Sequence, residues 1–312
     1  MTATIPPVLA VLRPGGAAEL APLEQPLLRA DDAAASRGDG AFETMHVRPD
    51  GVWLLEDHLD RLAGSAAALS LNLPPREQLE AVVGTAVNGW RERGATEEAS
   101  VPTGGEAEVT EARVAEAGVK LICSRGPEYA PELGPTTYAL AFGISERLIA
   151  QRRTGLALQS LSFGYPADER ARAPWLLPGA KTLSYAVNMA ALRQAEASGF
   201  DDVLLISSDG YVLEGPTSGV VWAVGDRLYT VPTETGILAS TTVGYLFDNA
   251  HRLGLSTHRQ LITRQELPNV DGVWLCSSVR GIVEVTSLDG QKLPSSHLTA
   301  RLNELLGFSR GS

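Results

Sequence analysis

The chain has 312 residues, a hydrophobic content of 44% and a formal net charge of −11. This length suits two domains of ordinary size, each with its own core, and the acidic charge disfavours binding to nucleic acid, which attracts basic protein surfaces. Neither a run of about 18 apolar residues nor a basic signal-peptide head is present, so we expect a cytoplasmic protein without membrane contact. The two cysteines, Cys123 and Cys276, lie in apolar runs and indicate neither a disulfide framework nor a metal site.

The first part of the chain alternates strand and helix patterns. Strands are predicted at 8–12, 40–47 and 119–123, and helices at 56–70 and 76–91. The segment 91–118 is acidic and nearly free of large apolar residues, which indicates a flexible acidic loop. We therefore predict a small N-terminal α/β domain at 1–123, followed by a proline-rich interdomain connector at 124–135.

The remainder, 136–312, reads as a larger domain rich in short strands with tight connections. Strands are predicted at 137–144, 156–164, 201–206 and 211–215, and helices at 184–198, 241–253 and from about 296. The helix at 184–198 is expected to bury a stripe formed by Leu183, Val187, Ala190 and Ala191. This pattern favours a pseudo-barrel β domain with helices and, for the whole chain, a two-domain α/β (α+β) fold.

Three features of this second domain fit together chemically. Lys181 follows a Pro-Gly turn, Glu214 comes 33 residues later, and G-I-L-A-S-T-T (236–242) opens a predicted helix. A lysine amine forms an imine with pyridoxal phosphate, a carboxylate keeps the ring nitrogen protonated, and amides at a helix start bind phosphate. Taken singly, each also fits an ordinary role: a surface lysine, a turn carboxylate and a helix N-cap. Among the three lysines, Lys120 begins an apolar strand and Lys292 lies in a terminal turn, so only Lys181 has suitable flanks.

Six motifs occur in an order that points to one family. They are R-G-D-G-A-F-E-T (37–44), H-L-D-R-L (58–62), K-T-L-S-Y (181–185), E-G-P-T-S (214–218), G-I-L-A-S-T-T (236–242) and S-S-V-R-G-I-V-E-V (277–285). Their order resembles the fold-type IV pyridoxal-phosphate enzymes, which include branched-chain and D-amino-acid aminotransferases and 4-amino-4-deoxychorismate lyase. The resemblance covers nearly the whole chain and implies a homodimer.

The resemblance also implies roles for individual residues. Lys181 is expected to bond the cofactor and move protons, and Thr44 to face the substrate and assist protonation. The expected cofactor-binding residues are Lys181, Glu214, Arg61, Thr241, Thr242, Ser278 and Tyr185. Arg125 and Arg280 are nominated for substrate anions, whereas His46 and His58 are read as structural.

The sequence departs from the family at two places. The asparagine usual five residues after the acid is replaced by Gly219, and the arginine common near 236–242 is absent, since Ala239 and Val243 occupy the neighbouring positions.

The reaction itself stays open between two main alternatives. A lyase releases 4-aminobenzoate and pyruvate from aminodeoxychorismate, in folate synthesis, whereas an aminotransferase acts on branched-chain or D-amino acids and needs a 2-keto acid acceptor. The K-T-L-S spacing, and the absence of an Arg-x-His pair at Arg125, favour the lyase. A third alternative is a degenerate cofactor-binding relative without activity, which the two departures motivate. In each case the expected small-molecule partner is an amino compound, and no metal is expected.

Overall fold

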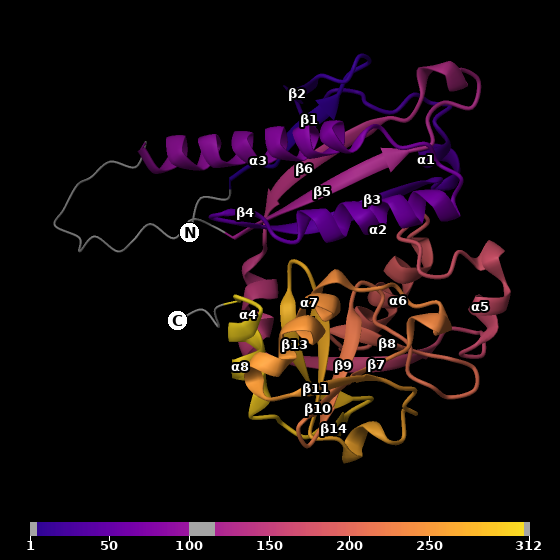
Figure 1. The fold of residues 1–312 in the computed structure, drawn as a ribbon, viewed down its shortest axis with the longest axis vertical. Helices are drawn as coiled ribbons and strands as arrows, with labels where there is room; N and C mark the ends of the chain where they lie inside the picture. The colour runs from indigo at the N-terminus through magenta and orange to yellow at the C-terminus, as the bar shows by residue number, and fades with distance from the viewer. Residues whose placement is uncertain (1–4, 100–115, 309–312) are drawn as a thin grey trace. The chain divides into compact units, whose positions relative to one another are not determined.

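The computed structural model describes residues 5–99 and 116–308, which form two compact units (Figure 1). The N-terminal unit comprises residues up to Ile144 together with Lys181–Ser184, and the C-terminal unit comprises Ser145–Ala180 and residues from Tyr185 onward. This division lies later than the predicted connector at 124–135. The reason is that β6 (Thr137–Gly143), expected to open the second domain, pairs with strands of the first sheet.

The N-terminal unit is built on a six-stranded sheet. Its strands are β1 (Val8–Leu12), β2 (Ala18–Ala21), β3 (Gly40–Arg48), β4 (Gly51–Val52), β5 (Ala117–Ser124) and β6, in the order β2-β1-β6-β5-β3-β4. All neighbouring pairs are antiparallel. The helices α2 (Leu55–Ala68) and α3 (Arg76–Ala99) pack on the sheet (Figure 1).

The two faces of this sheet differ in what they carry. Side chains alternate along a strand, and Ala41 and Met45 of β3 lie in one buried cluster with Leu62 of α2 and Val82 of α3. Phe42, Thr44 and His46 therefore lie on the opposite face. This opposite face is the one on which part of the candidate site is found.

Several elements of the N-terminal unit differ from the prediction. α3 continues to Ala99 and β5 starts at Ala117, so both ends of the predicted loop 91–118 are regular structure; residues 100–115 lie outside the described residues. The helix continues because R-E-R-G-A-T-E-E-A is rich in the strong helix formers Arg, Glu and Ala. The short strand β2 and the helix α1 (Ala33–Arg37), whose N-cap is Asp32, were not predicted.

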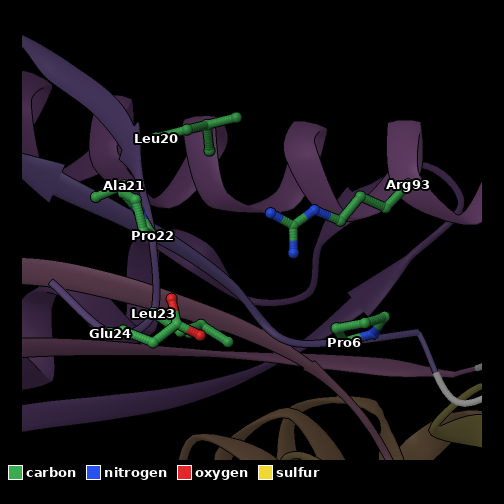
Figure 2. Close-up of a pocket in the computed structure, with 7 residues that line it drawn as sticks. All are labelled: Pro6, Leu20, Ala21, Pro22, Leu23, Glu24 and Arg93. Atoms are coloured by element: carbon green, nitrogen blue, oxygen red, sulfur yellow. The ribbon is translucent and has the colours of Figure 1, made fainter.

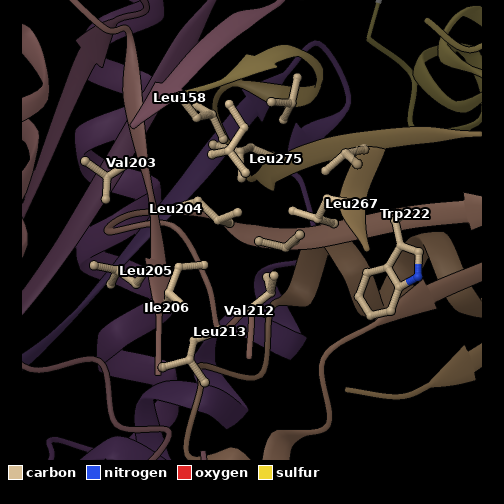
Figure 3. Close-up of a cluster of buried hydrophobic side chains, with 14 of the residues drawn as sticks. Leu158, Val203, Leu204, Leu205, Ile206, Val212, Leu213, Trp222, Leu267 and Leu275 are labelled. Carbon is tan, nitrogen blue, oxygen red and sulfur yellow. The ribbon is translucent and has the colours of Figure 1, made fainter. Parts of the chain in front are cut away.

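The C-terminal unit contains an eight-stranded mixed sheet. Its strands are β7 (Leu156–Ser162), β8 (Asp202–Ile206), β9 (Gly219–Val224), β10 (Arg227–Thr230), β11 (Ser256–Arg259), β12 (Gly272–Ser277), β13 (Gly281–Leu288) and β14 (Gln291–Lys292). The order is β11-β10-β9-β12-β13-β7-β8, with β14 beside β13. Leucine, valine and isoleucine side chains from these strands form the core, together with Trp222 (Figure 3). Isolated bridges Ile206–Val212 and Tyr211–Thr263 link the edge strand β8 to the chain after β11, as a pseudo-barrel requires.

Five α-helices belong to the described part of the C-terminal unit. They are α4 (Glu146–Thr154), α5 (Glu169–Arg172), α6 (Ala186–Ala197), α7 (Thr241–Asn249) and α8 (Leu298–Leu305). The predicted strand 211–215 forms only the two isolated bridges. The predicted stripe of α6 is confirmed only in part: Ala191 packs against the core cluster, whereas Val187 is 68% exposed, and the fully buried residue of the helix is Ala195. None of the helices in residues 5–99 and 116–308 is long and apolar enough to cross a membrane.

Candidate active site

Lys181 is held beside the free edge of β3 in the N-terminal unit. The Phe42 amide donates to the Lys181 carbonyl at 3.2 Å, and the Leu183 amide donates to the Gly40 carbonyl at 2.8 Å. The Lys181 amide in turn donates to Ser65 Oγ of α2 at 3.0 Å. Because Thr182 pairs with Ala41, the Lys181 side chain shares the face of Phe42, and its Nζ lies 4.4 Å from the centre of the Phe42 ring.

Two further polar side chains lie on the same face of the sheet. Thr44, nominated from the sequence, is half-buried and stands opposite Lys120 in the β3–β5 register. The Lys120 Nζ lies 5.7 Å from the centre of the Phe42 ring. Phe42 and Lys120 were not among the residues nominated from the sequence. Strand alternation places Phe42 with Thr44, but only the pairing of β3 with β5 reveals Lys120.

Arg61 is fixed by a buried carboxylate on the helix-covered side of the sheet. Its Nε donates to Glu43 Oε1 at 2.8 Å and its Nη2 donates to Glu43 Oε2 at 2.6 Å, a bidentate pair. His58 Nδ1 lies 2.7 Å from the same Oε2. Burial opposes ionisation of Glu43, but the Arg61 charge and the hydrogen bonds from Arg61 and His58 outweigh it and lower its pKa to about 2. Burial lowers the pKa of His58, so this ring is neutral near pH 7.

We expect Glu43→Gln to lower the free energy of unfolding at pH 7 by about 3 kcal/mol, because it leaves the partly buried Arg61 without its counter-charge. The Glu43 contribution is complete above the ordinary glutamate pKa of 4.5 and is lost as pH falls towards 2. The deficit of the variant relative to wild type should therefore shrink below pH 4.5. Urea unfolding at several pH values measures this.

The control for this prediction is Glu196→Gln, on the exposed side of α6. It should leave the unfolding free energy nearly unchanged across the same pH range. An equal effect of the two substitutions at pH 7 would contradict a structural role for the Glu43–Arg61 pair.

Glu214 is positioned in the C-terminal unit by the turn that precedes α7. The Leu238 amide donates to Glu214 Oε2 at 3.1 Å, and the Leu205 amide donates to the Glu214 carbonyl at 2.9 Å. The Gly179 amide, just before Lys181, donates to the Gly236 carbonyl of the same turn at 3.0 Å. The two motifs 178–180 and 236–242 are therefore bonded to each other through main-chain atoms.

Arg170 is a charged neighbour of Glu214 that the sequence did not reveal. Burial lowers the pKa of Arg170, and the negative charge of Glu214 partly offsets this. Its Nη2 donates to the Leu177 carbonyl at 3.3 Å. The charged run D-E-R-A-R around Arg170 carries no signal that separates it from a solvated surface segment.

The first turn of α7 has the features of a phosphate site. Ser240 is its N-cap, with Oγ accepting from the Val243 amide at 3.3 Å. Thr242 is 1% exposed, and neither its Oγ1 nor Ser218 Oγ has a hydrogen-bond partner in the described part of the chain. Buried hydroxyls without partners are unfavourable, so a ligand with acceptor oxygens fits beside these amides and hydroxyls.

Gly219 lies next to the first turn of α7, at the end of the sheet where the predicted phosphate-binding residue Ser278 is also found. A Cβ on Gly219 would lie 3.2 Å from both Ser240 Cβ and Val243 Cγ2, so a larger residue here would require these side chains to shift by a few tenths of an ångström. Gly219 pairs with Cys276 in β12, and the buried Ser278 follows in the next turn. The two family departures therefore belong together, because Val243 fills the space that a longer residue at 219 would need.

The two arginines nominated for substrate anions each form an ion pair inside their own unit. Arg125 Nε donates to Asp39 Oδ2 at 2.6 Å and its Nη2 donates to the Leu69 carbonyl at 2.6 Å. Arg280 Nη1 donates to Asp202 Oδ2 at 2.6 Å, and both of these side chains are nearly buried. Each arginine thus has an internal carboxylate partner.

The other nominated residues and one surface pocket complete the description. Thr241 is the first residue of α7, and Tyr185 is the half-buried N-cap of α6. The pocket, of about 490 Å³, lies near β2 and α3 and is lined by Pro6, Leu20, Ala21, Pro22, Leu23, Glu24 and Arg93 (Figure 2). It contains none of the nominated site residues. Cys123 and Cys276 are buried free thiols, and burial raises the pKa of Cys123 to about 12, which makes it unreactive.

Comparison with known proteins shows the family of the chain. Residues 40–288 match the model of the amino-transferase class IV family. The chain is 39% identical to the bifunctional aminodeoxychorismate lyase / D-amino acid transaminase of Mycobacterium tuberculosis, over 90% of this chain and 92% of the relative. It is 28% identical to the D-alanine aminotransferase of Bacillus licheniformis, over 85% and 84% of the two chains.

Comparison with solved structures supports the same family assignment. A pyridoxal-phosphate-bound structure of a hypothetical aminotransferase from M. tuberculosis superposes with a TM-score of 0.85 at 37% identity, covering 97% of this chain and 98% of the other. A fold IV transaminase from Curtobacterium pusillum superposes with a TM-score of 0.84 at 37% identity, covering 97% and 100%. The two-unit architecture is thus that of fold-type IV enzymes.

Proposed function

The chain belongs to the amino-transferase class IV family and is a pyridoxal-phosphate-dependent enzyme, and from this premise we propose that it is a 4-amino-4-deoxychorismate lyase. The observation that favours a lyase over an aminotransferase is the surroundings of Arg125. D-amino-acid aminotransferases of the best-known type use an Arg-x-His pair for the substrate carboxylate; no such pair occurs near Arg125, which is followed by Gly126 and Pro127 and is bound by Asp39. A lyase does not need that Arg-x-His pair.

Each residue of the site has a defined task in this proposal. When bound, pyridoxal phosphate supplies a ring that stabilises negative charge beside the substrate nitrogen. Lys181 Nζ bonds the cofactor at rest and afterwards carries a proton to and from the substrate. Glu214 keeps the proton on the ring nitrogen, oriented by the Leu238 amide. The first turn of α7 with Thr242, together with Ser278 and Arg61, binds the phosphate, while Tyr185 contacts the ring hydroxyl.

The Thr44 hydroxyl has the last proton-transfer role. It lies on the same face of the N-terminal sheet as Lys181, and we assign to it protonation of the leaving three-carbon unit. Release of pyruvate leaves an aromatic ring, 4-aminobenzoate, so the reaction needs no second substrate.

We expect sustained release of 4-aminobenzoate when the cofactor-loaded protein is mixed with aminodeoxychorismate and no keto acid is added. The fluorescence of 4-aminobenzoate follows the reaction through many turnovers. The Thr44→Val variant tests the hydroxyl, because it keeps the shape of the side chain, and it should be slower by about 10²-fold. A fully loaded protein that forms no product would contradict the lyase proposal.

An aminotransferase of D-amino acids is the second candidate. The bifunctional relative favours it, because that protein is named for both activities. A panel of D- and L-amino acids with 2-oxoglutarate distinguishes the two activities, since only transamination requires the acceptor.

We also propose a homodimer, consistent with apolar side chains exposed on the C-terminal unit. Trp175 is 77% exposed, and Val187 and Met189 of α6 are 68% and 42% exposed. Such apolar patches commonly mark protein interfaces. Sedimentation at micromolar concentration should give twice the chain mass of 33.1 kDa, and Val187→Glu should shift the protein towards the monomer. A monomeric wild type would contradict this proposal.

A further inference from the structure

We propose that Arg152 is a positioning residue of the cofactor site, and that its guanidinium group fixes the main chain of the turn 278–280 for phosphate binding. The inference rests on the proposed function, because it concerns the phosphate site assigned there to the start of α7 and to Ser278. It is argued from residues of the C-terminal unit alone.

The first argument is the burial of a charged side chain that the proposed chemistry does not use. Arg152 lies in α4 and is only 2% exposed. Arginine keeps its charge in proteins, and moving a charge out of water is costly unless the fold supplies hydrogen-bond partners. The partners of Arg152 therefore indicate what this side chain does.

The second argument is the pair of carbonyl groups that Arg152 binds. Its Nε donates to the Arg280 carbonyl at 2.8 Å, and its Nη2 donates to the Val279 carbonyl at 2.9 Å. These two residues directly follow Ser278 in the turn between β12 and β13. Because the guanidinium group is planar and rigid, its two donors fix both carbonyls at once, which the single ammonium group of a lysine cannot do.

The third argument is the direction in which this leaves the amides of the turn. The Val279–Arg280 peptide is trans, so its carbonyl and its N–H point in opposite directions. The Val279 carbonyl points towards Arg152, and the Arg280 amide therefore points away from it. Carbonyl oxygens repel a phosphate, whereas amides directed to one side attract it. Arg152 thus holds two repelling oxygens on its own side of the turn.

The fourth argument is that the surroundings keep both Arg152 and the turn in place. The guanidinium carbon of Arg152 lies 4.7 Å from the centre of the buried Phe308 ring. A Cβ on Gly281 would lie 2.8 Å from Cγ of the same ring, so Phe308 packs against both Arg152 and the first residue of β13. The side chain of Arg280 is held separately by Asp202. The turn is therefore fixed through its main chain and through a side chain.

Binding of the cofactor with and without its phosphate tests the inference without relying on turnover. The full-length apoprotein is titrated with pyridoxal phosphate and with pyridoxal, followed by the visible absorbance of the lysine-bound form, and inorganic phosphate is tested as a competitor. We expect Arg152→Lys, which keeps the charge but not the planar fork, to weaken binding of pyridoxal phosphate and of inorganic phosphate by roughly 10-fold. Binding of pyridoxal should stay unchanged.

A second variant and a control complete the experiment. Arg152→Met removes both hydrogen bonds and should weaken binding of pyridoxal phosphate at least as much as Arg152→Lys does. The matched control is Arg147→Lys, because Arg147 is an exposed arginine of the same helix, and it should bind like wild type. Melting temperatures show which variants are folded, and Arg152→Lys alone carries the test if Arg152→Met does not fold.

The outcomes separate this inference from the proposed function. Wild-type affinity for pyridoxal phosphate in folded Arg152→Lys would overturn the positioning role. An equal loss of affinity for pyridoxal phosphate and pyridoxal would also overturn it, because such a loss indicates a general distortion of the fold. A phosphate-specific loss in Arg152→Lys, together with a wild type that forms no 4-aminobenzoate, would support the role of Arg152 and contradict the lyase.

Discussion

Lys181→Ala should lower turnover of the amino substrate by about 10³-fold or more, because it removes both the covalent attachment of the cofactor and the group that moves protons. The fold should survive, since the contacts that place this residue are made by its main chain: its carbonyl accepts from the Phe42 amide and its amide donates to Ser65 Oγ. Steady-state kinetics and the visible spectrum measure the two losses together.

The control for Lys181 is Lys292→Ala, which should retain wild-type turnover and spectrum. Added methylamine should restore part of the activity of Lys181→Ala if the missing amine is the cause. Substantial unaided turnover by Lys181→Ala would contradict the central assignment.

Glu214→Gln should lower kcat by about 10²-fold or more while the cofactor stays bound. The amide keeps the size of the side chain but cannot balance the charge of a protonated ring nitrogen. The phosphate contacts expected at α7 and Ser278 are separate residues, so the dissociation constant for the cofactor should change much less than kcat. Stopped-flow spectra and cofactor titration measure these two quantities.

Glu234→Gln is the matched control, because Glu234 is exposed in the short helical turn before Gly236. It should behave like wild type in both measurements. Unchanged kcat in Glu214→Gln would remove this carboxylate from the site.

The parts of the site that follow local sequence rules were predictable. Lys181 follows a Pro-Gly turn, and Ser240 followed by two threonines is an ordinary helix start, so both features depend on neighbouring residues. The strand 8–12 and the helices at α2 and α7 were found from their periodicity for the same reason. Family assignment and cofactor rested on the order of these local motifs, and the comparisons confirm them.

The parts that depend on distant pairing were not predictable. Lys120 reaches the face of Lys181 only through the register of β5 on β3, in which Thr44 pairs with a residue 76 positions away. The carboxylate partners of Arg125 and Arg280 are 86 and 78 positions away in the chain, so these ion pairs could not be predicted from the sequence. Part of the predicted stripe of α6 is exposed, because helical periodicity cannot distinguish a face that is buried in the chain from one that is left exposed.

The most direct test of the account is to locate the cofactor on the chain. The loaded protein is reduced with borohydride, digested, and analysed by mass spectrometry for the phosphopyridoxyl group. The chain has three lysines, Lys120, Lys181 and Lys292, and the account predicts label on Lys181 alone. Label on Lys120 or Lys292 in place of Lys181, or no label on a yellow protein, would contradict it.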